Sequence, residues 1–280
     1  MSTFSMGPAI LFCPADRPDR YAKALDRADA VIIDLEDAVA AGNKQAARRA
    51  LVENQLDPQR TIVRVNPVNT PDFAADLAAI EQTAHRTLML AKTETPGNLA
   101  AVAGFDVVAL CETALGILNA PQLAAAENVV ALMWGAEDLV ASLGGSSSRK
   151  ASGTYRDVAR HARSQVLLAA GAYGKTAIDS VYIDIPDLAG LLGETVDAVA
   201  SGFGAKASIH PSQMSVIRQA FAPSAEEVER ARRILAAAQE AAGVFTFEGQ
   251  MVDEPLLRHA RATLRRSGTS SPSTGQSLRD

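Results

Sequence analysis

Short apolar runs alternate with helical segments along most of the chain, and this rhythm constrains the fold more than any other feature. Runs that are apolar throughout indicate strands buried on both faces of a parallel sheet. We expect eight strands, at residues 9–13, 30–33, 61–66, 87–90, 107–112, 129–134, 180–184 and 206–210. Eight strands alternating with helices predict an α/β fold of the (β/α)8 TIM-barrel type, and an open doubly wound sheet is the alternative.

The length of 280 residues suits one barrel with an extension. We expect the barrel in residues 1–222, a C-terminal helical extension or lid in residues 223–266, and a disordered Ser/Thr/Gly-rich tail in residues 267–280. Within the extension, Ser224 and Glu227 have the spacing of a capping box. The Gly/Ser-rich residues 144–153 predict a mobile loop.

Composition and charge exclude several classes of function. A net charge of -5 offers no attraction to nucleic acid or to an anionic membrane surface. No apolar run reaches the roughly 18 residues of a membrane span, and residues 1–8 lack the pattern of a signal peptide. Cys13 and Cys111 do not make a disulfide framework. We therefore expect a soluble, cytoplasmic protein.

Polar side chains follow most of the expected strands. In a TIM barrel the active-site groups come from the C-terminal ends of the strands, so these residues are expected to face one another. The set comprises Asp34, Glu36, Asp37, Arg64, Asn66, Lys92, Glu112, Glu137, Asp138, Asp184 and His210.

Two carboxylates from this set are candidates for a metal site. Glu112 and Asp138 end neighbouring expected strands, which lie about 4.8 Å apart. Carboxylates without a Cys/His cluster favour a hard ion, Mg2+ or Mn2+, whose other ligands are water and substrate. Each carboxylate also fits a first-turn acid of the following helix. The small residues Gly135 and Ala136 leave room for an oxo acid beside the metal, and their backbone N–H groups are candidate contacts.

The remaining polar groups have two readings each. Arg64 is a candidate fork for a substrate carboxylate, or a structural partner of Glu36 or Asp37. His210 fits a catalytic group or a cap of the next helix, and Glu137 fits a residue that orients the metal ligands or a partner of a basic side chain.

Five segments resemble, in order, motifs of the citrate lyase β-subunit-like group of the HpcH/HpaI aldolase superfamily. They are residues 34–39 (DLEDAV), 64–66 (RVN), 112–117 (ETALGI), 135–139 (GAEDL) and 209–213 (IHPSQ). The resemblance covers roughly residues 8–266 and implies a (β/α)8 barrel that assembles as a homotrimer or a dimer of trimers. It also implies Mg2+ and acyl-CoA chemistry.

The resemblance assigns roles to individual residues. Glu112 and Asp138 match the Mg2+ ligands, and Arg64 matches the group that binds the oxo acid. Glu36 and Asp37 match the acidic residues that support them.

One further role comes from the C-terminal segment. Residues 251–255 (MVDEP) are similar to a segment of malyl-CoA and citramalyl-CoA lyases in which an aspartate from a neighbouring subunit is the general acid/base. Asp253 holds that position, although it is also a natural N-cap of the last helix.

These assignments predict a carbon–carbon lyase. It would cleave a 3-hydroxyacyl-CoA (malyl-, citramalyl- or citryl-CoA-like) into acetyl-CoA or a related acyl-CoA and a 2-oxo acid, with Arg17 and Lys92 as candidate contacts of the CoA phosphates. The alternatives are a citrate lyase β subunit that depends on an acyl carrier protein, a CoA-independent 2-oxo acid aldolase, and a non-catalytic oxo-acid-binding barrel.

Overall fold

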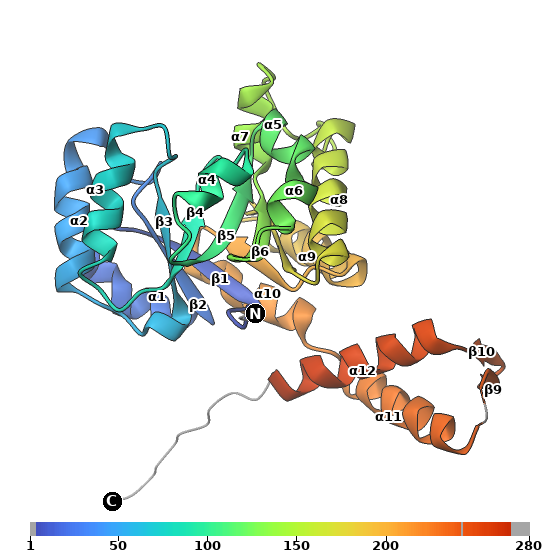
Figure 1. Cartoon of the computed structure of the whole chain (residues 1–280). Coiled ribbons are helices and arrows are strands. Elements are labelled where there is room, and N and C mark those ends of the chain that lie inside the picture. Colours follow the sequence, from blue (N-terminus) through green and yellow to red (C-terminus); the bar gives the residue numbers. More distant parts are fainter. Residues whose placement is uncertain (1–3, 242, 270–280) are drawn as a thin grey trace, which may run out of the picture. The chain divides into compact units, whose positions relative to one another are not determined.

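The computed structural model describes residues 4–241 and 243–269 and contains a closed barrel of eight parallel strands in chain order, β1 to β8 (Figure 1). The barrel closes between β1 and β8. The strands are β1 Ala9–Pro14, β2 Ala30–Asp34, β3 Thr61–Val65, β4 Thr87–Leu90, β5 Asp106–Cys111, β6 Val129–Trp134, β7 Thr176–Asp179 and β8 Ala205–Ser208. The prediction of a TIM barrel is confirmed.

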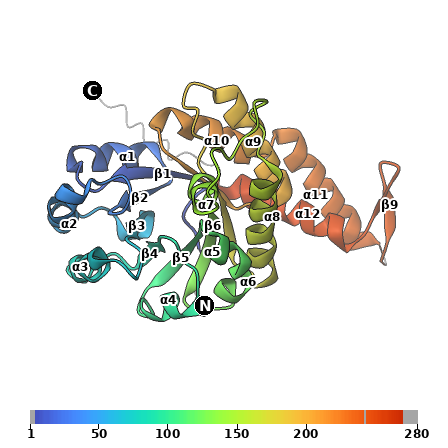
Figure 2. The ribbon, with the colours of Figure 1, turned by 90° about the horizontal axis from the view of Figure 1, so that it is seen from above.

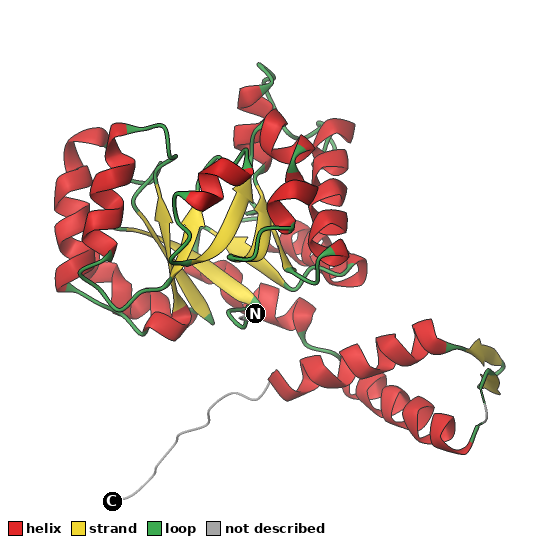
Figure 3. Cartoon of the chain, in the orientation of Figure 1, coloured by secondary structure: helices red, strands yellow, loops and turns green. Residues whose placement is uncertain are grey.

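Helices surround the strands, as the view from above shows (Figure 2). They follow the strands in the expected alternation (Figure 3). The α-helices from β1 to the one that follows β8 are α1 Tyr21–Arg27, α2 Lys44–Glu53, α3 Pro71–Ile80, α4 Pro96–Ala100, α5 Ala114–Leu118, α6 Ala120–Ala124, α7 Ala136–Ser142, α8 Asp157–Ala172, α9 Leu188–Ser201 and α10 Met214–Phe221.

Alternate residues of each strand fill the barrel interior. Because side chains of a strand alternate between its faces, β2 sends Ala30 and Ile32 inward and β5 sends Val108 and Leu110 inward. The intervening residues pack under the helices, which is why the strands read as continuous apolar runs. The same alternation continues to the last residue of each strand and decides which polar groups face the barrel mouth.

The seventh strand differs from its prediction. We expected residues 180–184, but β7 is Thr176–Asp179 and residues 180–184 leave the barrel. The pairing of Ile178 with Met133 on one side and Ala205 on the other fixes this position. The run Val181-Tyr182-Ile183 has strand-like composition, but Val181 lines the cavity at the barrel mouth and Ile183 is exposed at the surface. The eighth strand likewise ends at Ser208 rather than at residue 210.

The residues from Arg218 onward form a second unit. In it, α11 (Ala225–Glu240) and α12 (Glu254–Thr269) pack together around Ala231, Ile234, Val252 and Ala260. An antiparallel hairpin, β9 Phe245–Phe247 and β10 Gln250–Val252, joins the two helices.

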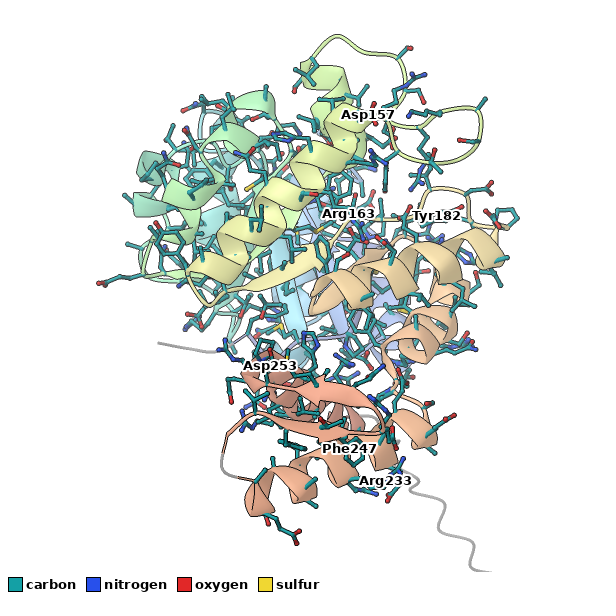
Figure 4. The ribbon with its side chains drawn as sticks, turned by 90° about the vertical axis from the view of Figure 1, so that its right-hand side faces the viewer. Asp157, Arg163, Tyr182, Arg233, Phe247 and Asp253 are labelled. Carbon is teal, nitrogen blue, oxygen red and sulfur yellow. The ribbon has the colours of Figure 1, made fainter. Side chains whose placement is uncertain are left out.

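Two local contacts shape this unit. The predicted capping box is present, because the Ser224 hydroxyl accepts from the Glu227 N–H and the Glu227 carboxylate accepts from the Ser224 N–H. Arg233 lies beside Phe247 of the hairpin, with 5.8 Å between its guanidinium carbon and the ring centroid (Figure 4).

The division between the units lies between Ile217 and Arg218, within α10, rather than at residue 222. Helix α12 continues to Thr269, so residues 267–269 are helical and not part of a disordered tail. The rest of the predicted tail, residues 270–280, lies outside the described residues. In the described part of the chain no helix combines the length and apolar character needed to cross a bilayer.

Candidate active site

The mouth of the barrel is lined by residues that end or directly follow the strands. Asp34 and Arg64 lie opposite each other in the register of β2 and β3, and both point inward because Ile32 and Ile62 do. Glu112 follows β5 with the parity of Leu110, and Gly135 follows β6 with the parity of Met133. Strand parity therefore brings a carboxylate, a guanidinium, a second carboxylate and a small residue to one opening.

Arg64 is held by two acids. Its Nε and Nη2 donate to the two oxygens of Asp34 at 2.8 and 2.6 Å, and its Nη1 lies 3.1 Å from Glu36 Oε2. Its guanidinium carbon also stands 4.9 Å from the ring centroid of Phe12. Burial opposes the charge, but the carboxylates outweigh it and raise the pKa of Arg64 above its ordinary value. The structure thus gives Arg64 the structural pairing as well as a place in the mouth.

Lys92 completes the charged rim. Its Nζ donates to Glu36, and it lies 3.4 Å from Asp37 Oδ2 and 3.6 Å from Asp138 Oδ1. The backbone of Lys92 has a positive φ of 49°, which a residue with a side chain rarely adopts. In this conformation its N–H donates to Glu112 Oε1 at 3.0 Å. Lys92 therefore neutralises the acids of the rim, and its contact with a CoA phosphate stays a prediction.

Glu112 is a buried carboxylate of the mouth whose pKa is raised. Its side chain is buried, and burial together with the charge of Asp138 raises its pKa to about 8, although Arg64 and Lys92 act in the opposite direction. Asp138 lies in the first turn of α7 and is partly exposed. A carboxylate with a raised pKa beside a second carboxylate favours a bound cation in place of its proton.

Gly135 leaves space beside Glu112. A Cβ at this position would lie 2.8 Å from the Glu112 Cβ and 2.9 Å from its Oε2, so only glycine fits. The Gly135 N–H donates to the Cys111 carbonyl at 3.2 Å, which leaves the N–H of Ala136 as the candidate substrate contact. These residues border a cavity of about 230 Å³ that is also lined by Phe12, Asp34, Asp37, Ala38, Arg64, Leu110, Glu112, Met133, Glu137, Asp138, Ser180, Val181 and Ile209.

The residues present fit Mg2+. This ion commonly takes one or two protein carboxylates and leaves its other positions to water and substrate. Glu112 and Asp138 supply two such oxygens at the cavity, and a cation there would relieve the repulsion that raises the pKa of Glu112. In residues 4–241 and 243–269 no group of three or more His, Cys, Asp or Glu side chains is arranged to hold a metal, so the candidate site rests on these two carboxylates.

Other predicted residues lie elsewhere or serve the fold. Asn66 donates to Asp76 and to the Leu35 carbonyl, below the rim. His210 accepts at Nδ1 from the Ser212 N–H, which matches its capping reading. Asp184 is exposed and does not end a strand, because β7 stops at Asp179. Asp253 belongs to the second unit, where its carboxylate accepts from the Leu256 N–H at 3.3 Å (Figure 4).

Sequence reasoning missed the principal partner of Arg64. We expected Glu36 or Asp37, but Asp34 holds the guanidinium with two hydrogen bonds. The signal was the position of Asp34, which has the parity of the inward residues Ala30 and Ile32. Phe12 was also missed, since an aromatic residue in an apolar run reads as core.

Comparisons with known proteins find similar sequences along nearly the whole chain. Residues 9–211 match the family model of the HpcH/HpaI aldolase/citrate lyase group. A citrate lyase subunit beta-like protein of Mycobacterium tuberculosis is 54% identical over 268 residues, covering 96% of this chain and 98% of that protein. The mitochondrial citramalyl-CoA lyase of Homo sapiens is 33% identical over 292 residues, covering 91% of this chain and 84% of that enzyme.

A solved structure is similar along nearly the whole chain. It is the crystal structure of the protein CitE from Mycobacterium tuberculosis in complex with magnesium, acetoacetate and coenzyme A. The TM-score is 0.90 at 55% sequence identity, and the match covers 94% of this chain and 99% of that chain.

Proposed function

Because the chain belongs to the HpcH/HpaI aldolase/citrate lyase family, we propose that it is a Mg2+-dependent carbon–carbon lyase acting on CoA thioesters and oxo acids. In its proposed reaction a 3-hydroxyacyl-CoA of the malyl-, citramalyl- or citryl-CoA type is cleaved into acetyl-CoA, or a related acyl-CoA, and a 2-oxo acid. Relatives that are named citramalyl-CoA lyase, or that bind magnesium and coenzyme A, support this reaction class.

One observation carries the proposal. The buried Glu112 carboxylate, whose pKa is raised to about 8, shares the cavity at the barrel mouth with Asp138 and with the guanidinium of Arg64. Two carboxylates can hold the cation, and the fixed positive charge of Arg64 can hold an anionic substrate group. The cavity of about 230 Å³ suits a small oxo acid rather than a whole CoA thioester.

The chemistry follows from these positions. Glu112 and Asp138 would hold Mg2+, which supplies Lewis acidity to the hydroxyl that becomes the carbonyl. Arg64 offers a donor to the oxygen on which negative charge develops, and Asp34 and Glu36 keep that donor in place. The hydroxyl gives its proton to water, the carbon–carbon bond breaks, and the electron pair of that bond passes to the thioester as an enolate.

The enolate must then take up a proton. We assign this proton to the carboxyl of Asp253, with water as the alternative donor. Asp253 stands at the N-terminus of α12, where it also accepts from the Leu256 N–H. An assembly in which the second unit of one chain serves the barrel of another would meet this need. The expected homotrimer or dimer of trimers is of this kind, and light scattering of the purified protein tests it.

One observation bears on the cellular setting. Cys13 and Cys111 are buried free thiols, which agrees with a reducing compartment such as the cytoplasm.

A carrier-dependent citrate lyase β subunit is the second candidate, and stable co-purification with an acyl carrier protein would favour it. A non-catalytic barrel would bind the oxo acid and never turn over the thioester.

The test is an assay of the purified protein on malyl-CoA, citramalyl-CoA and citryl-CoA, with and without Mg2+. We expect turnover of at least one thioester, its loss with a chelator, and its loss in Glu112→Gln and Asp138→Asn. Calorimetry should show weakened Mg2+ binding in both variants, while Glu81→Gln, an exposed acid after α3, serves as the control. Undiminished activity of the two variants would show that Glu112 and Asp138 do not form the proposed metal site.

A further inference from the structure

An arginine fastens the segment after α7 to the barrel. The guanidinium carbon of Arg149 lies 3.8 Å from the ring centroid of Tyr155 and 4.9 Å from that of Tyr182. Its Nη1 is 2.8 Å from Glu194 Oε2 and donates to the Gly153 carbonyl at 2.9 Å. We call Arg149, Tyr155, Tyr182 and Glu194 the arginine clasp. A Gly/Ser-rich segment that reads as a mobile loop is therefore anchored in its middle.

The acceptor side of the clasp is built into the barrel wall. Glu194 of α9 also lies 3.1 Å from the Nζ of Lys206, and Lys206 pairs at 2.8 Å with Asp179 at the end of β7. Both Lys206 and Asp179 are fully buried. Arg163 of α8 pairs with Asp179 on its other side (Figure 4). This buried ionic network gives Glu194 a second cationic partner besides Arg149.

The aromatic side of the clasp is equally fixed. Tyr155 packs edge-on against Trp134 at a centroid separation of 5.1 Å, and the Trp134 indole donates to Asp179 at 2.8 Å. Tyr182 is held through its hydroxyl, which donates to Asp187, and through its carbonyl, which accepts from Gln213. Arg149 is thus the one partner contributed by the Gly/Ser-rich residues 144–153.

The clasp adjoins two neighbouring parts of the cavity wall at the barrel mouth, those that follow β6 and β7. On one side, Ser148 precedes Arg149, is buried, and donates from Oγ to Glu137 Oε1 at 2.6 Å. Glu137 lines the cavity and stands between Ala136 and Asp138. On the other side, Tyr182 directly follows Ser180 and Val181, which line the cavity. Arg149 therefore directly follows the residue that binds Glu137, and its guanidinium contacts the residue that directly follows Val181.

We propose that Arg149 is a positioning residue of the substrate pocket. By joining Tyr155, Tyr182 and Glu194, it holds Ser148 against Glu137, so that this part of the cavity wall keeps its place beside the neighbouring part formed by Ser180 and Val181. This inference rests on the lyase function proposed above. A substrate in the cavity would meet this wall in its ground state and in its transition state alike. Displacing the wall should therefore raise KM more than it lowers kcat.

Three variants separate the parts of the clasp. Arg149→Met removes the charge and the planar fork, Arg149→Lys keeps the charge without the stacking geometry, and Ser148→Ala removes only the hydroxyl at Glu137. Arg160→Met is the matched control, because Arg160 is exposed on α8 and pairs only with Asp157 at the surface. Ser148→Ala and Arg149→Lys keep the proposal testable if Arg149→Met fails to fold.

Two readouts are taken on the full-length protein. In steady-state kinetics, Arg149→Met should raise KM for the thioester about tenfold or more, with kcat within about threefold of the unaltered protein. The double variant Ser148→Ala/Arg149→Met should be no worse than Arg149→Met, since Ser148 acts through the anchored loop. In limited proteolysis, trypsin should cut after the exposed Lys150 about tenfold faster in Arg149→Met and unchanged in Arg160→Met.

The two readouts distinguish failure of this inference from failure of the proposed function. If the unaltered protein turns over no thioester, the lyase function fails, and trypsin cleavage together with calorimetric binding of oxaloacetate and Mg2+ decides the role of Arg149. Unchanged KM and unchanged cleavage in a folded Arg149→Met or Arg149→Lys would overturn the inference. So would additive effects of Ser148→Ala and Arg149→Met.

Discussion

Asp34 holds Arg64 at the mouth of the barrel through two hydrogen bonds, of 2.8 Å to Nε and 2.6 Å to Nη2. The same carboxylate also accepts the backbone N–H groups of Glu36 and Ala38, so it fixes both the guanidinium and the turn that carries the acidic rim. Asp34 is fully buried. Such a pair is tolerated because each charge compensates the other, and removal of one partner leaves the second uncompensated.

Asp34→Asn should therefore lower both stability and activity. Breaking one partner of a buried ion pair costs about 3–5 kcal/mol, which urea denaturation measures. The kcat/KM should fall at least about tenfold, because Arg64 loses its orientation. Asp37→Asn is the control, since Asp37 is largely exposed and meets Lys92 only at 3.4 Å, and it should cost below about 1 kcal/mol. Equal losses in the two variants would contradict the role of Asp34.

Gly135→Ala should weaken Mg2+ binding without touching a ligand. The added Cβ would stand 2.8 Å from the Glu112 Cβ and 2.9 Å from Oε2, so the Glu112 side chain must move. We expect an affinity loss of about tenfold or more by calorimetry, and a stability loss of about 1–3 kcal/mol from overpacking. Gly193→Ala in α9 is the matched control, because nothing lies within 4 Å of its added Cβ. It should be stabilising by about 0.5–1 kcal/mol. Unchanged Mg2+ affinity in Gly135→Ala would refute the constraint on Glu112.

Asp253 caps α12 and is the proposed proton donor, and a pair of variants separates the two roles. Asp253→Ser keeps an oxygen that can accept the Leu256 N–H and removes the carboxyl, whereas Asp253→Ala removes both. If Asp253 supplies the proton, both variants should lose about 100-fold or more in kcat. Only Asp253→Ala should lose about 1 kcal/mol in thermal or urea unfolding. A kcat in Asp253→Ser equal to that of the unaltered protein would leave Asp253 with the cap alone.

Strand parity explains how far the sequence could predict this protein. Glu112, Asp138 and Arg64 were predicted at the barrel mouth because they follow long apolar runs, and the structure brings them to one cavity. The seventh strand was misplaced because Val181-Tyr182-Ile183 has β-type residues, whereas the true strand is short and is fixed by pairing on both sides with β6 and β8. Composition reports local preference, and a barrel position depends on partners far along the chain.

The anchored loop shows the same limit. Glycine and serine around residues 144–153 predict mobility, since such residues bury little surface. The contacts of Arg149 with Tyr155, Tyr182 and Glu194 override that preference. The sequence of the loop alone does not predict these contacts. In the same way, Lys92 was predicted to contact a CoA phosphate from its position and charge, and its three acidic partners come from two different βα connections, after β2 and after β6.

His85 should make the protein lose stability in mild acid. Its side chain is buried, its Nδ1 has no hydrogen-bond partner among the described residues, and burial together with the charge of Arg86 lowers its pKa below 6.5. The unfolded chain therefore binds a proton at this residue before the folded chain does, so stability is full above about pH 6.5 and falls as the pH drops below it. The slope from one such group is at most about 1.4 kcal/mol per pH unit. Urea unfolding between neutral and mildly acidic pH should show a smaller loss in His85→Leu than in the unaltered protein, and no such difference in His161→Gln, at an exposed position of α8. Parallel pH profiles for His85→Leu and the unaltered protein would show that His85 does not carry this proton linkage.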